Sequence, residues 1–227
     1  MHGRLLDTAR GTEPVVAVSD DPARLAALAV ALADDGGRDL ARILRYDDAV
    51  VHGPWSVVAP ELVALPFWTP EFCATVVRAA EATGAFGADP EDPVPGHELS
   101  LAAISPRLFA HVEDDLALRV MPVLLRTWPA IEYAGLRDAF VIKFTPDGQA
   151  ELPLHHDVAQ VSASVRLNDG YEGGALEFPR QGFSTAATSV GTLVAWPSLV
   201  THPHRSAPVR RGVKYSLTLW FELPHQG

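Results

Sequence analysis

The sequence predicts an α+β protein that is mainly β, with helices in its first half and an antiparallel sandwich or jelly roll in its second half. The 19 prolines and 17 glycines among 227 residues indicate many turns and therefore many short strands. From Ala139 onward, short runs of β-branched and aromatic residues alternate with turn residues, which favours antiparallel strands over parallel βαβ units. The expected strands are 139–145, 160–167, 175–178, 192–196 and 213–221.

Helical periodicity and capping residues predict the helices of the first half. The run 21–36 predicts a helix, because Asp21 can cap its N-terminus, Pro22 follows, leucines recur at helical spacing and Gly36 ends it. It follows a short strand expected at 15–18. The run 69–84 starts with Thr-Pro and also ends with glycine, so it predicts a second helix. A third helix is expected from Ser105, and Pro122 should kink or split it because proline has no backbone N–H.

The expected domain organisation has two parts. Residues 1–55 are predicted to form a flanking strand and helix, and residues 56–227 are predicted to form one domain. Within that domain we expect a helical part at 56–137 and the β core at 138–222. The segment 84–98 is rich in proline, glycine and acids, which is typical of a surface connector; a lid over a site is the alternative.

Composition and charge exclude several classes of function. With 28 acidic and 18 basic side chains the net charge is −10, which argues against a nucleic-acid partner bound through counterion release. The single cysteine, Cys73, cannot form an internal disulfide or a multi-cysteine zinc site, and it reads as a buried apolar residue. Residues 1–10 contain no apolar h-region, which argues against secretion, and no apolar run approaches the ~20 residues that span a bilayer. We therefore predict a cytoplasmic protein with no membrane partner, and the sequence leaves its oligomeric state open.

Two groups of histidines indicate a metal site. In a strand, residues i and i+2 face the same side, so His155 and Asp157 converge while His156 faces away. A third ligand must come from another strand, and either His202 or His204 is placed to supply it. Two histidines and one carboxylate leave three metal positions open, which is the arrangement of non-haem Fe(II) oxygenases, whereas zinc prefers a closed tetrahedron or one open position.

A lysine at the start of an apolar strand extends this pattern. Lys214 follows His204 by ten residues and opens the β-rich run 215–220. A buried ammonium without an anionic partner is costly, so we expect Lys214 to meet an anion inside the barrel. The far carboxylate of a dicarboxylic cosubstrate would satisfy this requirement.

Taken together, these motifs resemble the Fe(II)/2-oxoglutarate-dependent dioxygenases. The resemblance is carried by residues 140–157, 167–178 and 191–220, and it covers roughly residues 60–222. It is greatest for the prolyl 4-hydroxylase type, and especially for the catalytic domain of procollagen lysyl hydroxylases. The resemblance implies a double-stranded β-helix (jelly-roll) core with the N-terminal helices packed on one side.

The resemblance also implies roles for individual residues. It implies His155, Asp157 and His204 as the catalytic iron ligands, with His204 preferred to His202 because the ten-residue offset to the basic residue matches the family pattern. It implies that Lys214 anchors the C5 carboxylate of 2-oxoglutarate. Lysyl hydroxylases carry arginine at this anchor position, so the lysine matches the prolyl branch instead.

Three further residues are candidates for binding. Ser216 lies on the same strand face as Lys214 and is expected to give the cosubstrate carboxylate a second hydrogen bond. Phe144 falls where many relatives place a tyrosine that bonds the cosubstrate, so without a hydroxyl it is expected only to wall the pocket. Arg166 is a candidate for meeting a carboxylate of the substrate, and a structural salt bridge is the alternative.

The function implied is that of a hydroxylase. Such an enzyme inserts oxygen into an unactivated C–H bond of an amino acid, peptide or protein side chain and releases succinate and CO₂, using Fe(II), 2-oxoglutarate and O₂, with ascorbate as an additional candidate cofactor. Halogenating relatives have a small residue at the position of Asp157, so the carboxylate favours hydroxylation. The alternatives are a non-catalytic jelly-roll binding protein and a dioxygenase that acts on a small molecule other than an amino acid.

Overall fold

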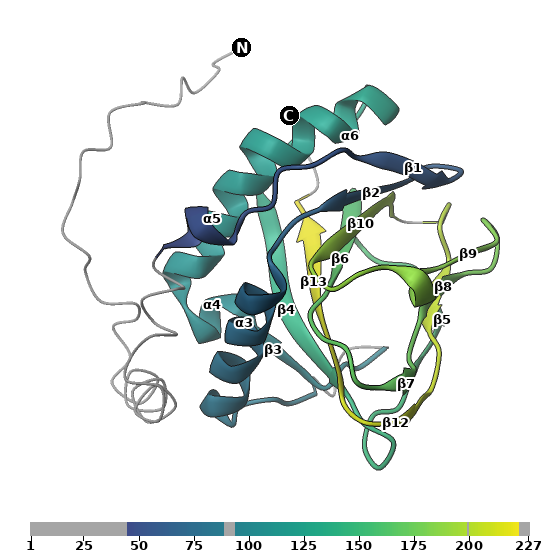
Figure 1. Cartoon of the computed structure of the whole chain (residues 1–227). Coiled ribbons are helices and arrows are strands. Elements are labelled where there is room, and N and C mark those ends of the chain that lie inside the picture. The colour runs from purple at the N-terminus through teal and green to yellow at the C-terminus, as the bar shows by residue number, and fades with distance from the viewer. Residues whose placement is uncertain (1–44, 89–93, 199, 223–227) are drawn as a thin grey trace.

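The computed structural model describes residues 45–88, 94–198 and 200–222 (Figure 1). The strand expected at 15–18 and the helix expected at 21–36 lie outside the described residues. Within the described ranges, no helix is long and apolar enough to cross a membrane. The helical elements are η1 (Tyr46–Ala49), α3 (Pro70–Thr83), α4 (Leu101–Ile104), α5 (Pro106–Asp115), the π-helical η2 (Leu116–Val120), α6 (Met121–Thr127) and η3 (Thr185–Ala187).

The strands form a larger and a smaller antiparallel sheet, and the helices α3 to α6 lie together on one side of the larger sheet (Figure 1). The order is β1-β2-β10-β6-β13-β4-β3 in the larger sheet and β5-β11-β8-β9 in the smaller one, and β12 pairs with β7. The mainly β jelly-roll class predicted from the sequence is therefore confirmed. The strands are β1 (Ser56–Ala59), β2 (Leu62–Pro66), β3 (Glu98–Ser100), β4 (Leu136–Phe144), β5 (Leu152–His155), β6 (Val161–Arg166), β7 (Glu172–Gly173), β8 (Leu176–Phe178), β9 (Phe183–Ser184), β10 (Thr192–Pro197), β11 (His204–Ser206), β12 (Val209–Arg211) and β13 (Lys214–Phe221).

The alternation of side chains along β13 separates the two faces of the larger sheet. The odd-numbered residues from Tyr215 to Phe221 belong to the main hydrophobic core, which they share with the helices. The even-numbered residues from Lys214 to Trp220 line cavities inside the barrel. Because successive strand residues point to opposite faces, one strand both anchors the helices and furnishes the interior of the barrel.

The helices begin and end at the capping residues that the sequence indicated. The side chain of Thr69 accepts a hydrogen bond from the Phe72 backbone N–H (3.2 Å), and Gly84 ends α3 in the left-handed conformation. The third expected helix is interrupted before Pro122, since η2 separates α5 from α6 and the Met121 N–H bonds the Leu116 carbonyl five residues back. The break agrees with the missing N–H of proline.

The part predicted to be helical, residues 56–137, also contains three complete strands and the start of β4, which corrects that expectation. The hairpin of β1 and β2 adds to the larger sheet beside β10, and β3 adds at its other edge. Four consecutive residues of β2, from Leu62 to Leu65, are buried. A strand that is buried on both faces has no alternating pattern, so its sequence does not show the two-residue period that identifies a strand.

Contacts of η1 cross the boundary predicted between residues 55 and 56. Tyr46 is 4% exposed, its hydroxyl donates to Asp115 (3.0 Å), and the Trp68 indole N–H donates to the Tyr46 oxygen (2.9 Å). Arg119 in turn pairs with Asp115 at 2.8 Å. This buried network joins residues before the predicted boundary to the helices and to the segment that precedes α3.

Replacing Gly191 with alanine is expected to lower the free energy of unfolding by about 3 kcal/mol, as measured by urea unfolding. Gly191 has φ +79°, and its carbonyl accepts hydrogen bonds from the backbone N–H groups of Phe67 and Trp68. An added Cβ would overlap the Trp68 carbonyl oxygen. Gly84→Ala is the matched control, because its φ is +59° but nothing lies within 4 Å of the added Cβ. We expect a loss of about 1 kcal/mol there, and equal losses in the two variants would contradict the steric explanation.

Candidate active site

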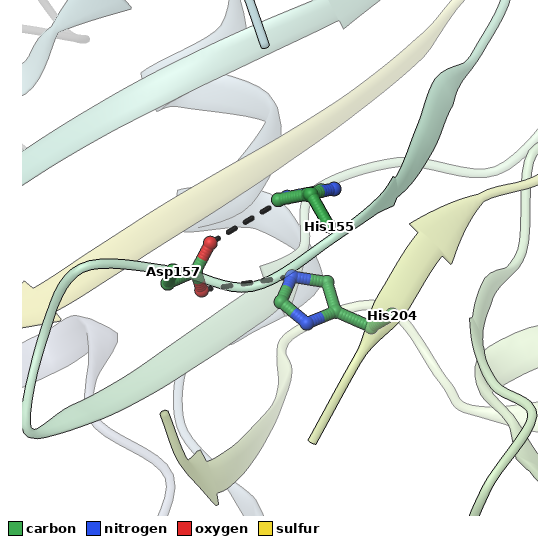
Figure 2. A group of neighbouring side chains, drawn as sticks. All are labelled: His155, Asp157 and His204. Carbon is green, nitrogen blue, oxygen red and sulfur yellow. Dashed lines mark ion pairs between the residues drawn. The ribbon is translucent and has the colours of Figure 1, made fainter. Parts of the chain in front are cut away.

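The pairing of β5 with β11 brings two histidines together. His155 at the end of β5 is the direct partner of His204 at the start of β11, and Asp157 follows two residues after His155. One ligand atom from each of the three side chains lies within 4.8 Å of the others. Figure 2 shows the carboxylate of Asp157 facing both imidazole rings.

Hydrogen bonds to backbone carbonyls determine which ring nitrogens are available to a metal. Nδ1 of His155 lies 2.7 Å from the Pro153 carbonyl oxygen, and Nδ1 of His204 lies 3.0 Å from the His202 carbonyl oxygen. A carbonyl oxygen can only accept, so each Nδ1 carries the hydrogen and each neutral ring keeps the lone pair on Nε2. Such bonds are the usual orienting contacts of metal-binding histidines.

The Nε2 atoms face the carboxylate of Asp157. The distances are 3.5 Å from His155 to Oδ1 and 3.6 Å from His204 to Oδ2. The Oδ2 atom is buried and has no hydrogen-bond partner among the described residues. Two lone pairs and a carboxylate that face one another repel unless a cation lies between them. This donor set therefore fits Fe(II), which accepts imidazole and carboxylate ligands.

The Asp157 carboxylate is ionised at neutral pH. Burial raises the pKa of Asp157, but hydrogen bonds from His155 and His204 and the charge of His204, which act while Nε2 carries a proton in the metal-free protein, lower it by more, so the pKa lies well below its ordinary value. The site therefore offers a metal two neutral ligands and one anionic ligand.

The structure places the other two histidines of these motifs away from the cluster. His202 is 1% exposed, and its ring nitrogens lie 2.9 Å from the Thr201 hydroxyl and 3.4 Å from the Pro60 carbonyl oxygen. His156 is exposed at the wall of the cavity described next. Of the two histidines that the sequence offered as third ligand, His204 is the one that lies with His155 and Asp157.

The three side chains open onto a cavity of about 270 Å³ between the two sheets. Its walls are largely apolar, and two of them are the indoles of Trp196 and Trp220, whose buried N–H groups lack an acceptor among the described residues. The aromatic, aliphatic and polar lining residues are Val94, Gly96, Glu98, Arg137, Phe140, Ile142, Leu152, His155, His156, Asp157, Val158, Ser164, Leu176, Trp196, His204, Ser206, Ser216, Thr218 and Trp220.

Lys214 lines a second, smaller cavity of about 20 Å³ that shares a wall with the first. The shared residues are Ser164, Leu176 and Ser216. The Lys214 ammonium lies 4.2 Å from the centre of the Phe144 ring, which is fully buried. No carboxylate lines this cavity among the described residues, so the ammonium has no ionic partner there.

Burial and, to a lesser extent, the nearby Arg166 guanidinium together lower the pKa of Lys214 to about 7. A buried cation without an anion, next to a second cation, fits the carboxylate of a bound ligand. The residues present therefore fit 2-oxoglutarate, with Lys214 in a position to hold its far carboxylate.

Arg166 lines the Lys214 cavity and not the larger one. Its guanidinium forms an ion pair with Asp169 (2.7 Å), donates to the Thr188 carbonyl (2.7 Å) and lies 5.1 Å from the centre of the Tyr171 ring. The structural salt bridge that the sequence left as the alternative is therefore present. The contact between Arg166 and the substrate stays a prediction. The position of Arg166 at the smaller cavity does not favour this contact.

Sequence reasoning missed two residues of these cavities. Tyr171 follows Gly170 after β6 and brings a hydroxyl-bearing ring to the cavity of Lys214, whereas the Phe144 ring beside the Lys214 ammonium has no hydroxyl. A Cβ at the neighbouring Gly174 would lie 3.0 Å from Cδ of Lys214, so this glycine lets the lysine side chain pass close to the backbone. Arg137 lines the larger cavity from the start of β4. The only indication in the sequence was a charged residue next to an apolar strand.

The affinity for 2-oxoglutarate is expected to decrease above pH 7, by up to about tenfold per pH unit. In the free protein Lys214 loses its proton as the pH rises through its pKa of about 7, while the anionic ligand requires the ammonium. Binding above pH 7 should therefore take up one proton, which calorimetry in buffers of different ionisation enthalpy measures. Without ligand, the unfolded lysine binds its proton up to pH ~10.4, so this group makes unfolding less favourable as the pH rises from 7 to 10.

Lys214→Arg is the control for this pH dependence. A guanidinium stays charged across the whole range, so proton uptake should disappear in this variant. Proton uptake of the same size in Lys214→Arg would show that another group is responsible.

The fold and the site together define the class of metal-dependent oxygenases that hold a metal with two histidines and one carboxylate inside a jelly roll. Residues 141–222 match the family profile described as the 2OG-Fe(II) oxygenase superfamily. This match confirms, over that segment, the resemblance seen in the sequence. The matched segment contains His155, Asp157, His204 and Lys214.

Sequence relatives include procollagen-lysine,2-oxoglutarate 5-dioxygenase 1 of Mus musculus, which is 35% identical over 80 residues. This alignment covers 34% of the present chain and 11% of the relative. The multifunctional procollagen lysine hydroxylase and glycosyltransferase of Caenorhabditis elegans is 23% identical over 171 residues, which cover 69% of the chain and 23% of the relative. The chain thus spans only a minor part of the length of these relatives.

Similar solved structures include the viral collagen prolyl hydroxylase of Paramecium bursaria Chlorella virus-1 in complex with 2OG. It has a TM-score of 0.55 and 17% identity, and the match covers 72% of this chain and 97% of that one. A prolyl-4-hydroxylase of Pseudomonas putida has a TM-score of 0.52 and 17% identity, with 82% and 100% coverage. At these identities the comparison shows that the fold is shared.

Proposed function

We propose that the chain is an Fe(II)- and 2-oxoglutarate-dependent hydroxylase that acts on an amino acid, a peptide or a protein side chain. The observation that carries the proposal is the geometry of His155, Asp157 and His204, whose ligand atoms face one another at the wall of a cavity. Next to this cavity is a buried lysine, Lys214, that has no ionic partner among the described residues. The family match supports the same assignment. The names of the relatives, which refer to collagen lysine and proline, support an amino-acid side chain as the target.

The bound metal and cosubstrate would supply the chemistry. Fe(II) with 2-oxoglutarate and O₂ provides the oxidant that inserts one oxygen atom into a C–H bond, and the second oxygen atom enters succinate as CO₂ is released. His155, Asp157 and His204 would hold the iron, and Lys214 with Ser216 would hold the far carboxylate of 2-oxoglutarate. Ascorbate as an additional cofactor stays a prediction.

The chain itself contributes orientation and a dry environment. The carbonyls of Pro153 and His202 fix the tautomers of the two histidines, so both metal-facing nitrogens are ready to bind without rearrangement. Apolar walls such as Phe140 and Ile142 exclude water from the site. Exclusion of water strengthens the interaction of Lys214 with an anion and protects a reactive centre from side reactions.

Anaerobic addition of Fe(II) and then 2-oxoglutarate tests the proposal. We expect a weak visible charge-transfer band that requires both additions, and succinate formation once O₂ is admitted. Folded protein that gives neither the band nor succinate would favour the alternative of a non-catalytic jelly-roll binding protein. Substrate-stimulated succinate release by compounds other than amino acids and peptides would support the second alternative, a dioxygenase of another small molecule. The cytoplasmic location and the absence of membrane and nucleic-acid partners stay predictions.

A further inference from the structure

Arg137 lies at the exposed edge of the cavity that contains the three candidate iron ligands. It is in β4 and is exposed, and its side chain belongs to the lining of this cavity. Among the described residues that line the cavity, it is the only arginine or lysine. Its position therefore gives a ligand in the cavity one cation to meet near the entrance.

Two contacts hold the guanidinium of Arg137 in place. Nη1 donates to the Val158 carbonyl oxygen at 2.5 Å, and Cζ lies 6.0 Å from the centre of the Trp220 ring. Val158 directly follows Asp157, so this hydrogen bond links the guanidinium to the segment that carries an iron ligand. A guanidinium has five N–H donors, and this single bond leaves donors for a second, bidentate partner.

The acidic residues around Arg137 do not form an ion pair with it among the described residues, although the guanidinium is near enough to the adjacent Asp138 to offset part of the rise that burial causes in the pKa of that carboxyl. Its neighbour Asp138 accepts a hydrogen bond from the Ala139 backbone N–H (2.7 Å), and Asp157 faces the two histidines. Within the described part of the chain, Arg137 forms no ion pair. Glu98 also lines the cavity, but from β3, where it pairs with Ile142, five residues further along β4.

The size of the cavity limits what can bind beside Arg137. Its volume of about 270 Å³ is just below the ~300–1,000 Å³ typical of small-molecule pockets. The adjoining cavity of Lys214 measures only about 20 Å³, so a bound 2-oxoglutarate must extend into the larger one past Ser216. The space left beside 2-oxoglutarate is therefore smaller than 270 Å³, which favours a small substrate over a large one.

We propose that Arg137 binds a carboxylate of the primary substrate, so that the substrate is a small carboxylate-bearing molecule such as a free amino acid. The inference rests on the proposed hydroxylase function and narrows its substrate class. A carboxylate takes two parallel N–H bonds from one guanidinium, with both partners charged, whereas the carbonyl of a residue inside a polypeptide takes weaker bonds in which only the donor is charged. Arg137 thereby distinguishes a free acid from the same residue within a chain.

The test compares free L-amino acids with their C-terminal amides and with tripeptides that have the same residue in the middle and blocked ends. The readouts are substrate-stimulated succinate release and a gain of one oxygen atom by mass spectrometry. With the unmodified protein, we expect the free acid to be preferred to its amide by at least tenfold in kcat/KM. Arg137→Gln should raise the KM for the acid at least tenfold, with a smaller effect on kcat, and should bring the acid and the amide close to equal. Arg137→Lys should recover part of the preference.

Arg126→Gln is the matched control, because it makes the same change in charge at an exposed arginine at the end of α6. This variant should keep the preference for the free acid. Equal use of acid and amide by the unmodified protein, or an unchanged preference in Arg137→Gln, would overturn the inference. Stimulation of succinate release by the blocked tripeptides alone would also overturn it. In each of these cases, turnover of 2-oxoglutarate without substrate would show that the proposed hydroxylase function still stands. If turnover and the charge-transfer band are both absent, the proposed function fails and the inference fails with it.

Discussion

Replacing His204 with alanine is expected to abolish succinate formation. The variant loses one of the three side chains whose ligand atoms face one another, and it leaves Asp157 and His155 as an incomplete pair. Removal of a residue that only orients a metal ligand already costs about 10–100-fold, so loss of a ligand should cost more than about a hundredfold. Succinate formation at saturating Fe(II) and 2-oxoglutarate measures the effect, and the iron content of the purified variant shows whether metal binding is the cause.

His202→Ala is the control for this prediction. Both histidines are buried, with exposed fractions of 1% for His202 and 3% for His204, so both substitutions remove a packed imidazole. The ring nitrogens of His202, however, lie against Thr201 and Pro60 and not against Asp157. We expect this variant to keep most of its activity despite some loss of stability. Activity that survives in His204→Ala and disappears in His202→Ala would overturn the assignment of the third ligand.

Replacing Lys214 with alanine is expected to raise the KM for 2-oxoglutarate at least about 30-fold without removing the iron. Truncating one partner of a buried charge pair costs about 2–5 kcal/mol, and each ~1.4 kcal/mol is a factor of ten in affinity. Without ligand the ammonium of Lys214 is buried and has no ionic partner among the described residues, so its removal should not destabilise the free protein through a lost ion pair. Steady-state kinetics and chemical unfolding of the ligand-free protein measure these two effects separately.

Lys143→Ala tests whether the effect is specific to the inside of the barrel. Lys143 pairs in register with Tyr215, the residue after Lys214, and its ammonium lies 2.8 Å from Glu81 at the outer side of the sheet. This variant removes the same charge at nearly the same height of the sheet, but it should leave the KM for 2-oxoglutarate unchanged. A similar rise in KM in both variants would point to a general electrostatic effect.

Much of the β core was predictable because its signals are local. The alternation along 213–221 gave the strand β13. The predicted convergence of His155 and Asp157 is present, although β5 ends at His155 and Asp157 lies beyond the strand. The capping residues Thr69 and Gly84 gave the ends of α3. By contrast, β2 escaped detection because its residues are buried on both sides and show no period.

The sequence by itself determined which residue types are available and which neighbours along a strand share a face. Only the tertiary structure decided which distant segments meet, because strand pairing depends on packing over the whole sheet and not on local pattern. The pairing of β5 with β11 places His204 opposite His155 and leaves His202 outside the cluster. In the same way, tertiary structure places Arg166 at the smaller cavity, where it forms an ion pair with Asp169. The register of β4 on β13 places Arg137 beside Trp220.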